Sequence, residues 1–354
     1  MAIVLLQLPV VKRKSEIRPQ KCPHYRGEPF QRWGKVRKPV RDSRYRSVQV
    51  YRYLCCHCRQ TFSHYPQGVD RADQTQRLRK LEAIFWVLGM SLRGVVTALS
   101  AFGVQLSHMT VWRDLQEQAD LLEKRRHWKP VGVLGLDGAY VRAWGNVRSV
   151  LVAVDLGEGK PVAIGYVDEY NSQAVRRWLE PLVKRLGVSV IVTDDLVHYK
   201  TVAQKLDLEH QIRQFHVRRW VGRTLKELRE SVPKDWLWVI DEVKLLITDL
   251  PLAGSRRLFE LWKQIPERRA GRDQHLSALD QLRPRNSGMH LLLIRLSEHG
   301  PNFRIFNWQT DVPWTNNGSE QVIGRMKMRS RTVRGYKSQQ VMLNALMLAG
   351  TSVC

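Results

Sequence analysis

Apolar residues in the middle of the chain recur with two different periods, one typical of strands and one of helices. β-Branched runs predict three strands, at 131–142, 147–156 and 160–168, and a glycine-containing turn between the last two predicts a hairpin. Asn171 is placed to cap an amphipathic helix that runs to about Leu186. A short β-branched run, Val188–Asp195, then predicts a buried fourth strand that ends in two aspartates.

This order of three hairpin-joined strands, a helix and a fourth strand is the order of the ribonuclease-H-like α/β fold. There the first and fourth strands lie adjacent and parallel, so Asp137 and Asp194 are expected to converge at the centre of a mixed sheet. Because side chains alternate along a strand, Asp194 and Asp195 point to opposite sides and only one can face that place. A predicted helix at 196–207 and a strand-like run at 210–217 continue the pattern.

The region from about 217 to 283 is predominantly helical in pattern and looks like an insertion into the α/β core. After it, Asn317 and Glu320 have the N-x-x-E spacing of a capping box. Glu320 is therefore either a helix cap or a third carboxylate that joins the two aspartates. Basic side chains follow it at Arg325, Lys327, Arg329, Arg331, Arg334 and Lys337.

The segment 73–125 carries apolar residues at helical spacing, with Ser91 and Ser107 at positions typical of helix N-caps. Three helices with a glycine-containing turn before the last predict a helix-turn-helix, whose final helix enters the major groove of DNA. The candidate base or phosphate contacts are His108, Thr110 and Arg113. The alternative is a three-helix unit that binds only protein.

Cysteines gather near the N-terminal end, on both sides of an alternating, aromatic-rich stretch. Cys55 and Cys58 have the C-x-x-C spacing that places two zinc ligands on one turn, but Tyr25 stands where the partner cysteine of Cys22 is expected. The predicted ligands of this zinc-ribbon-like module are Cys22, His24, Cys55 and Cys58, with His57 and His64 as alternatives to His24. A metal-free module held by aromatic packing is the other interpretation.

Charge indicates the partner. The chain of 354 residues has 58 Lys and Arg against 33 Asp and Glu, a formal charge of +25, and residues 1–60 hold 15 basic and 3 acidic side chains. Such a balance predicts binding to a polyanion, of which nucleic acid is the commonest. The five cysteines are too few and too uneven for a disulfide framework, which predicts a reducing compartment. No run approaches the length of a membrane span, so we expect a soluble cytoplasmic protein.

Three short motifs resemble those of one enzyme family. Asp137 in LDGAY, Asp194 in TDDLVHY and Glu320 in TNNGSEQVIGRMK, with a helical insertion before the glutamate, resemble the catalytic core of bacterial insertion-sequence transposases of the DDE type. The likeness covers about residues 20–350, and the third motif is the most specific. Family motifs place a tyrosine five positions after the second aspartate, and Tyr199 stands five after Asp194, so the resemblance selects Asp194 over Asp195.

The resemblance implies three regions, which are a basic zinc-ribbon-like module at 1–66, a helix-turn-helix domain at 67–128 and a ribonuclease-H-like catalytic domain at 129–354. It also implies that the three carboxylates hold two Mg²⁺ ions, for which Mn²⁺ can substitute, and that the enzyme cuts transposon ends and joins them to target DNA. A homodimer or larger assembly on DNA in the bacterial nucleoid is expected.

Further residues are assigned through the resemblance. His216 resembles a histidine that related transposases carry after the fifth strand, although a packed histidine at a strand end is equally consistent. The predicted phosphate contacts after the glutamate are Arg325, Lys327, Arg329 and Arg331. Asp155 and Asp168 are rival acids at hairpin ends. Base stacking is conceivable for Trp144, Trp308 and Trp314, but core burial is the more common role of such residues.

Two other functions fit the same motifs. One is a catalytically inactive, domesticated transposase that binds DNA as a regulator, which the incomplete cysteine set favours and the three intact acids oppose. The other is a ribonuclease-H-like nuclease that acts on branched DNA junctions.

Overall fold

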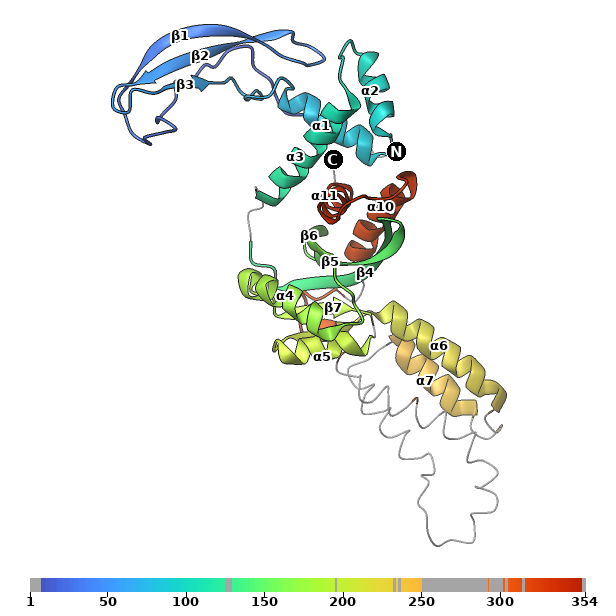
Figure 1. Cartoon of the computed structure of the whole chain (residues 1–354). Coiled ribbons are helices and arrows are strands. Elements are labelled where there is room, and N and C mark those ends of the chain that lie inside the picture. Colours follow the sequence, from blue (N-terminus) through green and yellow to red (C-terminus); the bar gives the residue numbers. More distant parts are fainter. Residues whose placement is uncertain are drawn as a thin grey trace, which may run out of the picture. The chain divides into compact units, whose positions relative to one another are not determined.

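The computed structural model describes residues 8–124, 129–194, 196–231, 237–249, 305–313 and 316–351, and the single residues 234, 292 and 302 (Figure 1). The chain divides into two compact units, of which the first comprises residues 1–127, 141–148 and 324–354 and the second residues 128–140 and 149–323. Asp195, Trp314 and the part of the predicted insertion from 250 to 283 lie outside the described residues. None of the helices that the structure describes is long and apolar enough to cross a lipid bilayer.

The second unit is built on a five-stranded mixed sheet. Its strands are β4 (Val133–Ala143), β5 (Asn146–Asp155), β6 (Lys160–Gly165), β7 (Val190–Thr193) and β8 (Glu209–Ile212). They lie in the order β6-β5-β4-β7-β8, with β4 parallel to β7, β7 parallel to β8 and β5 antiparallel to β6. The predicted adjacency of the first and fourth strands is confirmed, and the sheet is compatible with a ribonuclease-H-like core.

Helices α4 (Ser172–Leu186) and α5 (Val197–Lys205) follow β6 and β7 (Figure 1). The Asn171 side chain accepts a hydrogen bond from the Ala174 backbone N–H (3.0 Å), and Gly187, at φ +67°, ends α4 in the left-handed conformation that glycine adopts without strain. Both faces of the sheet are covered: Ile191 packs with the core that contains α4 and α5. Its neighbours in β7 instead pack against residues that include Ile305 of the 3-10 helix η3 (Ile305–Asn307).

The sequence prediction of a strand over 210–217 is wrong beyond Ile212. The Arg213 backbone N–H donates the last ladder bond to the Thr193 carbonyl (2.9 Å), and the Arg213 carbonyl accepts from Val217 N–H (3.3 Å), which starts a helix. Two helices of the predicted insertion are described, α6 (Gln214–Ser231) and α7 (Leu237–Asp249), and they lie side by side (Figure 1). Helical structure is therefore confirmed for Gln214–Ser231 and Leu237–Asp249.

The first unit contains a three-stranded antiparallel sheet and a set of helices. The strands are β1 (Phe30–Pro39), β2 (Ser47–Cys55) and β3 (Thr61–His64), and the helices are α1 (Gln76–Val87), α2 (Leu92–Ser100) and α3 (His108–Lys124). Three helices were expected between 73 and 125. The serine caps form as predicted, since Ser91 accepts from Gly94 N–H (3.0 Å) and Ser107 from Thr110 N–H (3.1 Å).

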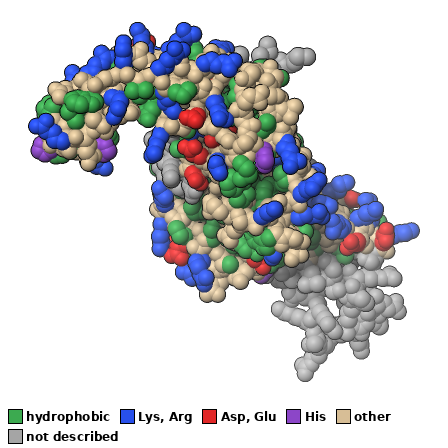
Figure 2. Space-filling model, turned by 45° about the horizontal axis from the view of Figure 1, so that its top comes forward, with side chains coloured by type: hydrophobic (Ala, Val, Ile, Leu, Met, Phe, Trp, Pro, Cys, Tyr) green, Lys and Arg blue, Asp and Glu red, His purple; other side chains and the backbone are tan. Residues whose placement is uncertain are grey.

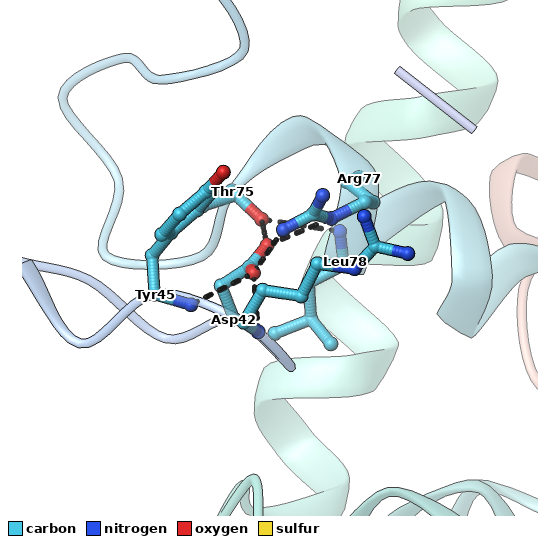
Figure 3. A network of polar contacts seen from close by, with 6 residues as sticks. Asp42, Tyr45, Thr75, Arg77 and Leu78 are labelled. Atoms are coloured by element: carbon cyan, nitrogen blue, oxygen red, sulfur yellow. Dashed lines mark hydrogen bonds and ion pairs between the residues drawn. The ribbon is translucent and has the colours of Figure 1, made fainter. Parts of the chain in front are cut away.

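The buried carboxylate of Asp42, between β1 and β2, connects the three-stranded sheet to helix α1 (Figure 3). Asp42 accepts hydrogen bonds from the Arg77 guanidinium, the Thr75 hydroxyl and the Tyr45 backbone N–H (3.2 Å). Thr75 also caps α1 by accepting from Leu78 N–H (3.2 Å). Burial alone would raise the pKa of Asp42, but the bonds from Arg77 and Thr75 outweigh it and hold the pKa below its ordinary value.

The C-terminal helices group with the first unit. Helix α11 (Gln339–Gly350) is largely buried from Met342 onward and packs against α3, where Asn344 Nδ2 donates to Gln116 Oε1 (2.9 Å). The second half of α10 (Asn317–Thr332) also belongs to this unit. The reason is apolar composition: α11 has a mostly hydrophobic sequence and needs a partner surface, which α3 provides.

Candidate functional site

Register places the two predicted aspartates at the same level of the sheet. Gly135 of β4 pairs with Val192 of β7 in a parallel ladder, and Asp137 and Asp194 each lie two residues further along. Asp194 follows the last residue of β7 directly, at the carboxyl end of the strand. The predicted convergence of these carboxylates is thus what the strand pairing produces.

The third acid is brought to this place by close packing at a glycine. A Cβ atom on Gly135 would clash with the Ser319 hydroxyl and lie 2.7 Å from Asn316 Oδ1, so the first turn of α10 fits against β4 only because no side chain intervenes. The Asn316 carbonyl accepts from the Glu320 backbone N–H (3.1 Å). The helix begins at Asn317, which therefore lies inside it instead of preceding it as the proposed capping box requires.

Arg213 joins these acids and was not singled out by the sequence. Its side chain is 5% exposed, and its guanidinium lies 3.0 Å from Asp137 Oδ1 and 3.5 Å from Glu320 Oε1. Glu320 itself is 54% exposed, so its carboxylate is accessible to a ligand from solvent. Glu320 thus contacts a buried cation from the first turn of α10.

Glu169 is a fourth carboxylate that the sequence analysis missed. It is buried and accepts hydrogen bonds from the Tyr140 hydroxyl (2.9 Å) and the Tyr199 hydroxyl (3.3 Å). Gly138, next to Asp137, leaves the room that the Glu169 carboxylate occupies. Burial, and then the charge of Glu169, raise the pKa of Tyr199, which keeps this phenol protonated as a donor.

Asp194 has the least satisfied carboxylate of the group. Burial raises its pKa to about 6; the Arg213 charge opposes the rise, and the Asp137 charge adds to it. Its Oδ1 atom is buried and has no hydrogen-bond partner among the described residues, and the same holds for Arg213 Nε. A buried carboxylate oxygen without a donor is what a cation would complete, so the oxygen donors fit a hard divalent metal.

The three acids do not form a compact ligand cluster. In the described part of the chain, the one group of three possible ligand atoms that lie within 4.8 Å of one another is formed by cysteines. Asp137, Asp194 and Glu320 are therefore wider apart than a single-ion cluster.

The rival acids have local roles. Asp155 accepts from the backbone N–H groups of Gly157 (2.8 Å) and Glu158 (3.3 Å) in the β5–β6 turn. Asp168 is exposed and accepts from Tyr170 N–H (3.1 Å). His216 lies in the first turn of α6, and its side chain is not among those described.

Two of the tryptophans considered for base stacking are described. Trp144 lies with Gly145 in the two-residue turn between β4 and β5, both at positive φ, and Arg148 lies over its ring. Trp308 is 51% exposed, so core burial is not its role.

The cysteines form two turns of the same construction. Cys22 N–H donates to Gly27 O (3.1 Å) and Cys55 N–H donates to Gln60 O (3.0 Å), and each turn then has an arginine at positive φ, Arg26 or Arg59. Tyr25 occupies in the first turn the position that Cys58 holds in the second. This matches the sequence pattern in which one ligand of a four-cysteine site is replaced.

Three thiols converge between these turns. The Sγ atoms of Cys22 and Cys58 lie 3.8 Å apart, and those of Cys22, Cys55 and Cys58 lie within 4.8 Å of one another. Tetrahedral zinc with Zn–S bonds of about 2.3 Å has sulfur atoms about 3.8 Å apart, so the thiols fit this ion.

The histidines near the thiols differ in their contacts. His24, the predicted fourth ligand, is exposed and is not part of the thiol group. His57 stacks on Tyr25 with ring centroids 3.8 Å apart, and His64 Nε2 lies within hydrogen-bond distance of Ser15 Oγ and the Ile17 carbonyl. The substitution of Tyr25 for a cysteine thus coincides with an aromatic stack beside the cluster.

The predicted DNA contacts of α3 lie on its exposed N-terminal part. His108 and Arg113 are exposed, and Thr110 is half-buried with its hydroxyl 2.9 Å from Ser107 Oγ. Helix α11 contacts later residues of α3, such as Gln116. The start of α3 therefore presents side chains in the way that a recognition helix requires.

The four basic residues after Glu320 divide into two pairs. Lys327 and Arg331 are exposed. Arg325 donates to the Gly350 carbonyl (2.7 Å), and Arg329 is buried over the Trp86 ring (4.0 Å) and donates to the Met90 carbonyl (3.2 Å). The prediction that Arg329 binds phosphate is wrong for this structure, because its guanidinium is enclosed within the first unit, where burial lowers its pKa to about 10.

Lys and Arg side chains also gather over the β1–β2 hairpin, where they appear as a blue border in Figure 2. The β1 strand is exposed along nearly its whole length. A groove of about 570 Å³ beside it is lined by Arg13, Lys14, Lys35, Val36, Arg37, Ser47, Val48 and Gln49. This lining contains four cations and no acid, which suits a phosphate backbone.

No protein-family model matches this chain, and no curated protein matches its sequence. Among solved structures, it is similar to a chain of the simian T-cell lymphotropic virus intasome in complex with PP2A regulatory subunit B56 gamma, with 21% identity over 33% of this chain and 49% of that chain and a TM-score of 0.21. The chain thus spans about half the length of that relative. It is also similar to the catalytic core domain of BIV integrase, with 16% identity over 40% of this chain and 88% of that chain and a TM-score of 0.20. The strand order and register of the five-stranded sheet are compatible with a ribonuclease-H-like core.

Proposed function

We propose that this chain is a DDE transposase, a metal-dependent enzyme that cuts the ends of a DNA element and joins them to target DNA. The observation that carries the proposal is that Asp137 on β4 and Glu320 on α10 both contact one buried guanidinium, beside Asp194 at the end of β7. The formal charge of +25 and the exposed basic surfaces of the first unit support a DNA substrate.

The ligands of two Mg²⁺ ions in this proposal are Asp137, Asp194 and Glu320. When bound, the ions activate the attacking oxygen and stabilise the leaving oxygen of a phosphodiester substitution. The chain contributes a rigid sheet that holds two of the acids in register and a helix start that holds the third. Glu320, being half-exposed, lies where a phosphate from solvent can reach it.

DNA binding is assigned to the first unit. The proposed contacts are His108 and Arg113 on α3, the groove beside β1, and the exposed pair Lys327 and Arg331. The thiols of Cys22, Cys55 and Cys58 are proposed to hold a structural Zn²⁺ with water or one further side chain as fourth ligand. Pairing of two DNA ends would require a dimer or larger assembly.

Substitution of Asp194 tests the proposal. We expect Asp194→Asn to lower metal-dependent cutting of DNA that carries the element's ends by about a thousandfold or more, because metal ligation supplies several kcal/mol of transition-state stabilisation. DNA affinity, measured by fluorescence anisotropy, should stay near that of the unsubstituted protein. Asp168→Asn is the matched control, since Asp168 is an exposed acid that caps a turn.

The outcomes separate the competing functions. Cutting that survives Asp194→Asn refutes the assignment of the site. End binding without any cutting by the unsubstituted protein, in Mg²⁺ or Mn²⁺, would point to a domesticated regulator. Cutting of branched junctions but not of linear ends would indicate a junction nuclease.

A further inference from the structure

We propose that Arg213 is a positioning residue that takes the place of a divalent cation between Asp137 and Glu320 and gives up these carboxylates when metal binds. The inference rests on the proposed metal-dependent function and concerns how the site is kept assembled without metal. In this proposal the Arg213 guanidinium competes with the divalent metal ions for the same carboxylates.

Contacts and burial carry the first step. The guanidinium is 5% exposed and spans two carboxylates that come from chain positions 137 and 320, at 3.0 Å and 3.5 Å. Without a cation between them, these acids and Asp194 would repel one another in a partly buried site. Arg213 therefore holds the acids together at the point where the positive charge is needed.

The backbone of Arg213 is fixed, but its head group is incompletely bonded. Its N–H donates to Thr193 O (2.9 Å) at the end of the sheet, and its carbonyl accepts from Val217 N–H (3.3 Å). Its Nε atom is buried and has no acceptor among the residues that the structure describes. Arginine has five N–H donors, so this side chain has unused capacity for a further acceptor such as a phosphate oxygen.

Competition follows from the shared lone pairs. The oxygens of Asp137 and Glu320 that contact Arg213 are proposed metal ligands, and a guanidinium and a divalent ion cannot both occupy the space between them. The guanidinium and a divalent ion bound to the same carboxylates would also repel each other strongly in a site of low polarity. Metal binding must then displace the head group from at least one carboxylate.

Metal binding without DNA tests the proposal. We expect Arg213→Gln to bind Mn²⁺ about tenfold more tightly than the unsubstituted full-length chain, within the usual range of coupling between two ligands of one site. Arg213→Lys keeps the charge and should change the affinity little. Arg219→Gln, which removes an exposed arginine of α6, the helix that follows Arg213, is the control for net charge. Free Mn²⁺ is measured by electron paramagnetic resonance.

A baseline isolates the relevant ions. Only the Mn²⁺ binding that is lost in Asp137→Asn is counted, which subtracts binding by the thiols. If Arg213→Gln binds this Mn²⁺ equally or more weakly, Arg213 is a structural buttress and the proposal is overturned. If no Mn²⁺ binding depends on Asp137 in either protein, the proposed metal site fails as well. The cutting assay with Asp194→Asn tests the proposed function, and the Mn²⁺ affinity of Arg213→Gln tests the competition. Thermal unfolding without metal confirms that each variant is folded.

Discussion

Position 135 shows how one missing side chain assembles a site from distant parts of the chain. Gly135 lies in the central strand β4, two residues before Asp137. Its lack of a Cβ lets Asn316 and Ser319 of the α10 start approach the strand backbone. Glu320 is the residue after Ser319, so its location depends on the absence of a Cβ atom at position 135.

We predict that Gly135→Val lowers metal-dependent cutting by about a hundredfold or more, because a displacement of roughly 1 Å at a catalytic group costs this much. Gly132→Val is the matched control, since a Cβ at Gly132 meets nothing within 4 Å. Cutting rates and far-ultraviolet circular dichroism of both variants would be compared. Unchanged cutting by folded Gly135→Val would show that α10 is positioned by other contacts.

Sequence alone predicted the residues whose position depends on local pattern. Asp137 and Asp194 belong to strands that their own β-branched neighbours define, so their convergence followed once the strand order was inferred. Arg213 and Glu169 were missed, because each gains its role from partners far away in the chain. Neither has a local motif that distinguishes it from other charged residues.

At the scale of elements, α1 and α3 are joined by a buried pair of acids. Glu82 on α1 is fully buried, and Asp114 on α3 is 6% exposed. Burial, and then the charge of Asp114, raise the pKa of Glu82 to about 9, so one proton is retained by the pair at neutral pH. Arg79, ion-paired with Asp70 and Glu117, supplies the nearest positive charge.

This pair predicts a pH-dependent stability. The ordinary pKa of glutamate is 4.5 and that of folded Glu82 about 9, so between these values the folded protein holds a proton that unfolding releases. The free energy of unfolding of the first unit should therefore fall as the pH rises through this range. Glu82→Gln, which is neutral at every pH, should remove this contribution and raise stability at pH 8 more than at pH 5.

Urea denaturation at both pH values would measure the effect. Glu227→Gln, an exposed change on α6, is the control and should keep the original pH slope. A slope that persists undiminished in Glu82→Gln would mean that another group binds the proton.

Element boundaries were predictable only where they are set locally. The caps at Ser91 and Asn171 were read correctly, because their side chains bond to backbone groups three residues away. The end of β8 was misplaced, because apolar and β-branched residues continue the strand-like pattern past Ile212, while the sheet has no further partner there. Sheet pairing, a tertiary property, decided the boundary.

At the scale of the whole molecule, the units are interleaved along the sequence. The first unit draws on three separate segments, and α11 completes the packing around α3. The sequence predicts domains in simple succession, because composition changes mark linkers but do not show which earlier surface a later helix covers.

The helix α11 should therefore stabilise the N-terminal helices. We predict that Leu346→Ala, at a fully buried position, lowers the stability of the first unit by about 2–5 kcal/mol. Hydrogen exchange followed by mass spectrometry should show faster exchange in α3. Leu343→Ala, at a half-buried position of α11, should have a smaller effect. Acceleration confined to residues 317–351 would show that α3 does not depend on α11.

The interleaving has a consequence for biogenesis. Because α11 is made some two hundred residues after α3, the N-terminal helices emerge from the ribosome long before the helix that covers them. At typical rates of about 5–20 residues per second, this interval lasts on the order of tens of seconds. The surface of α3 that α11 buries is exposed throughout that time, so nascent chains of this protein should be clients of ribosome-associated chaperones.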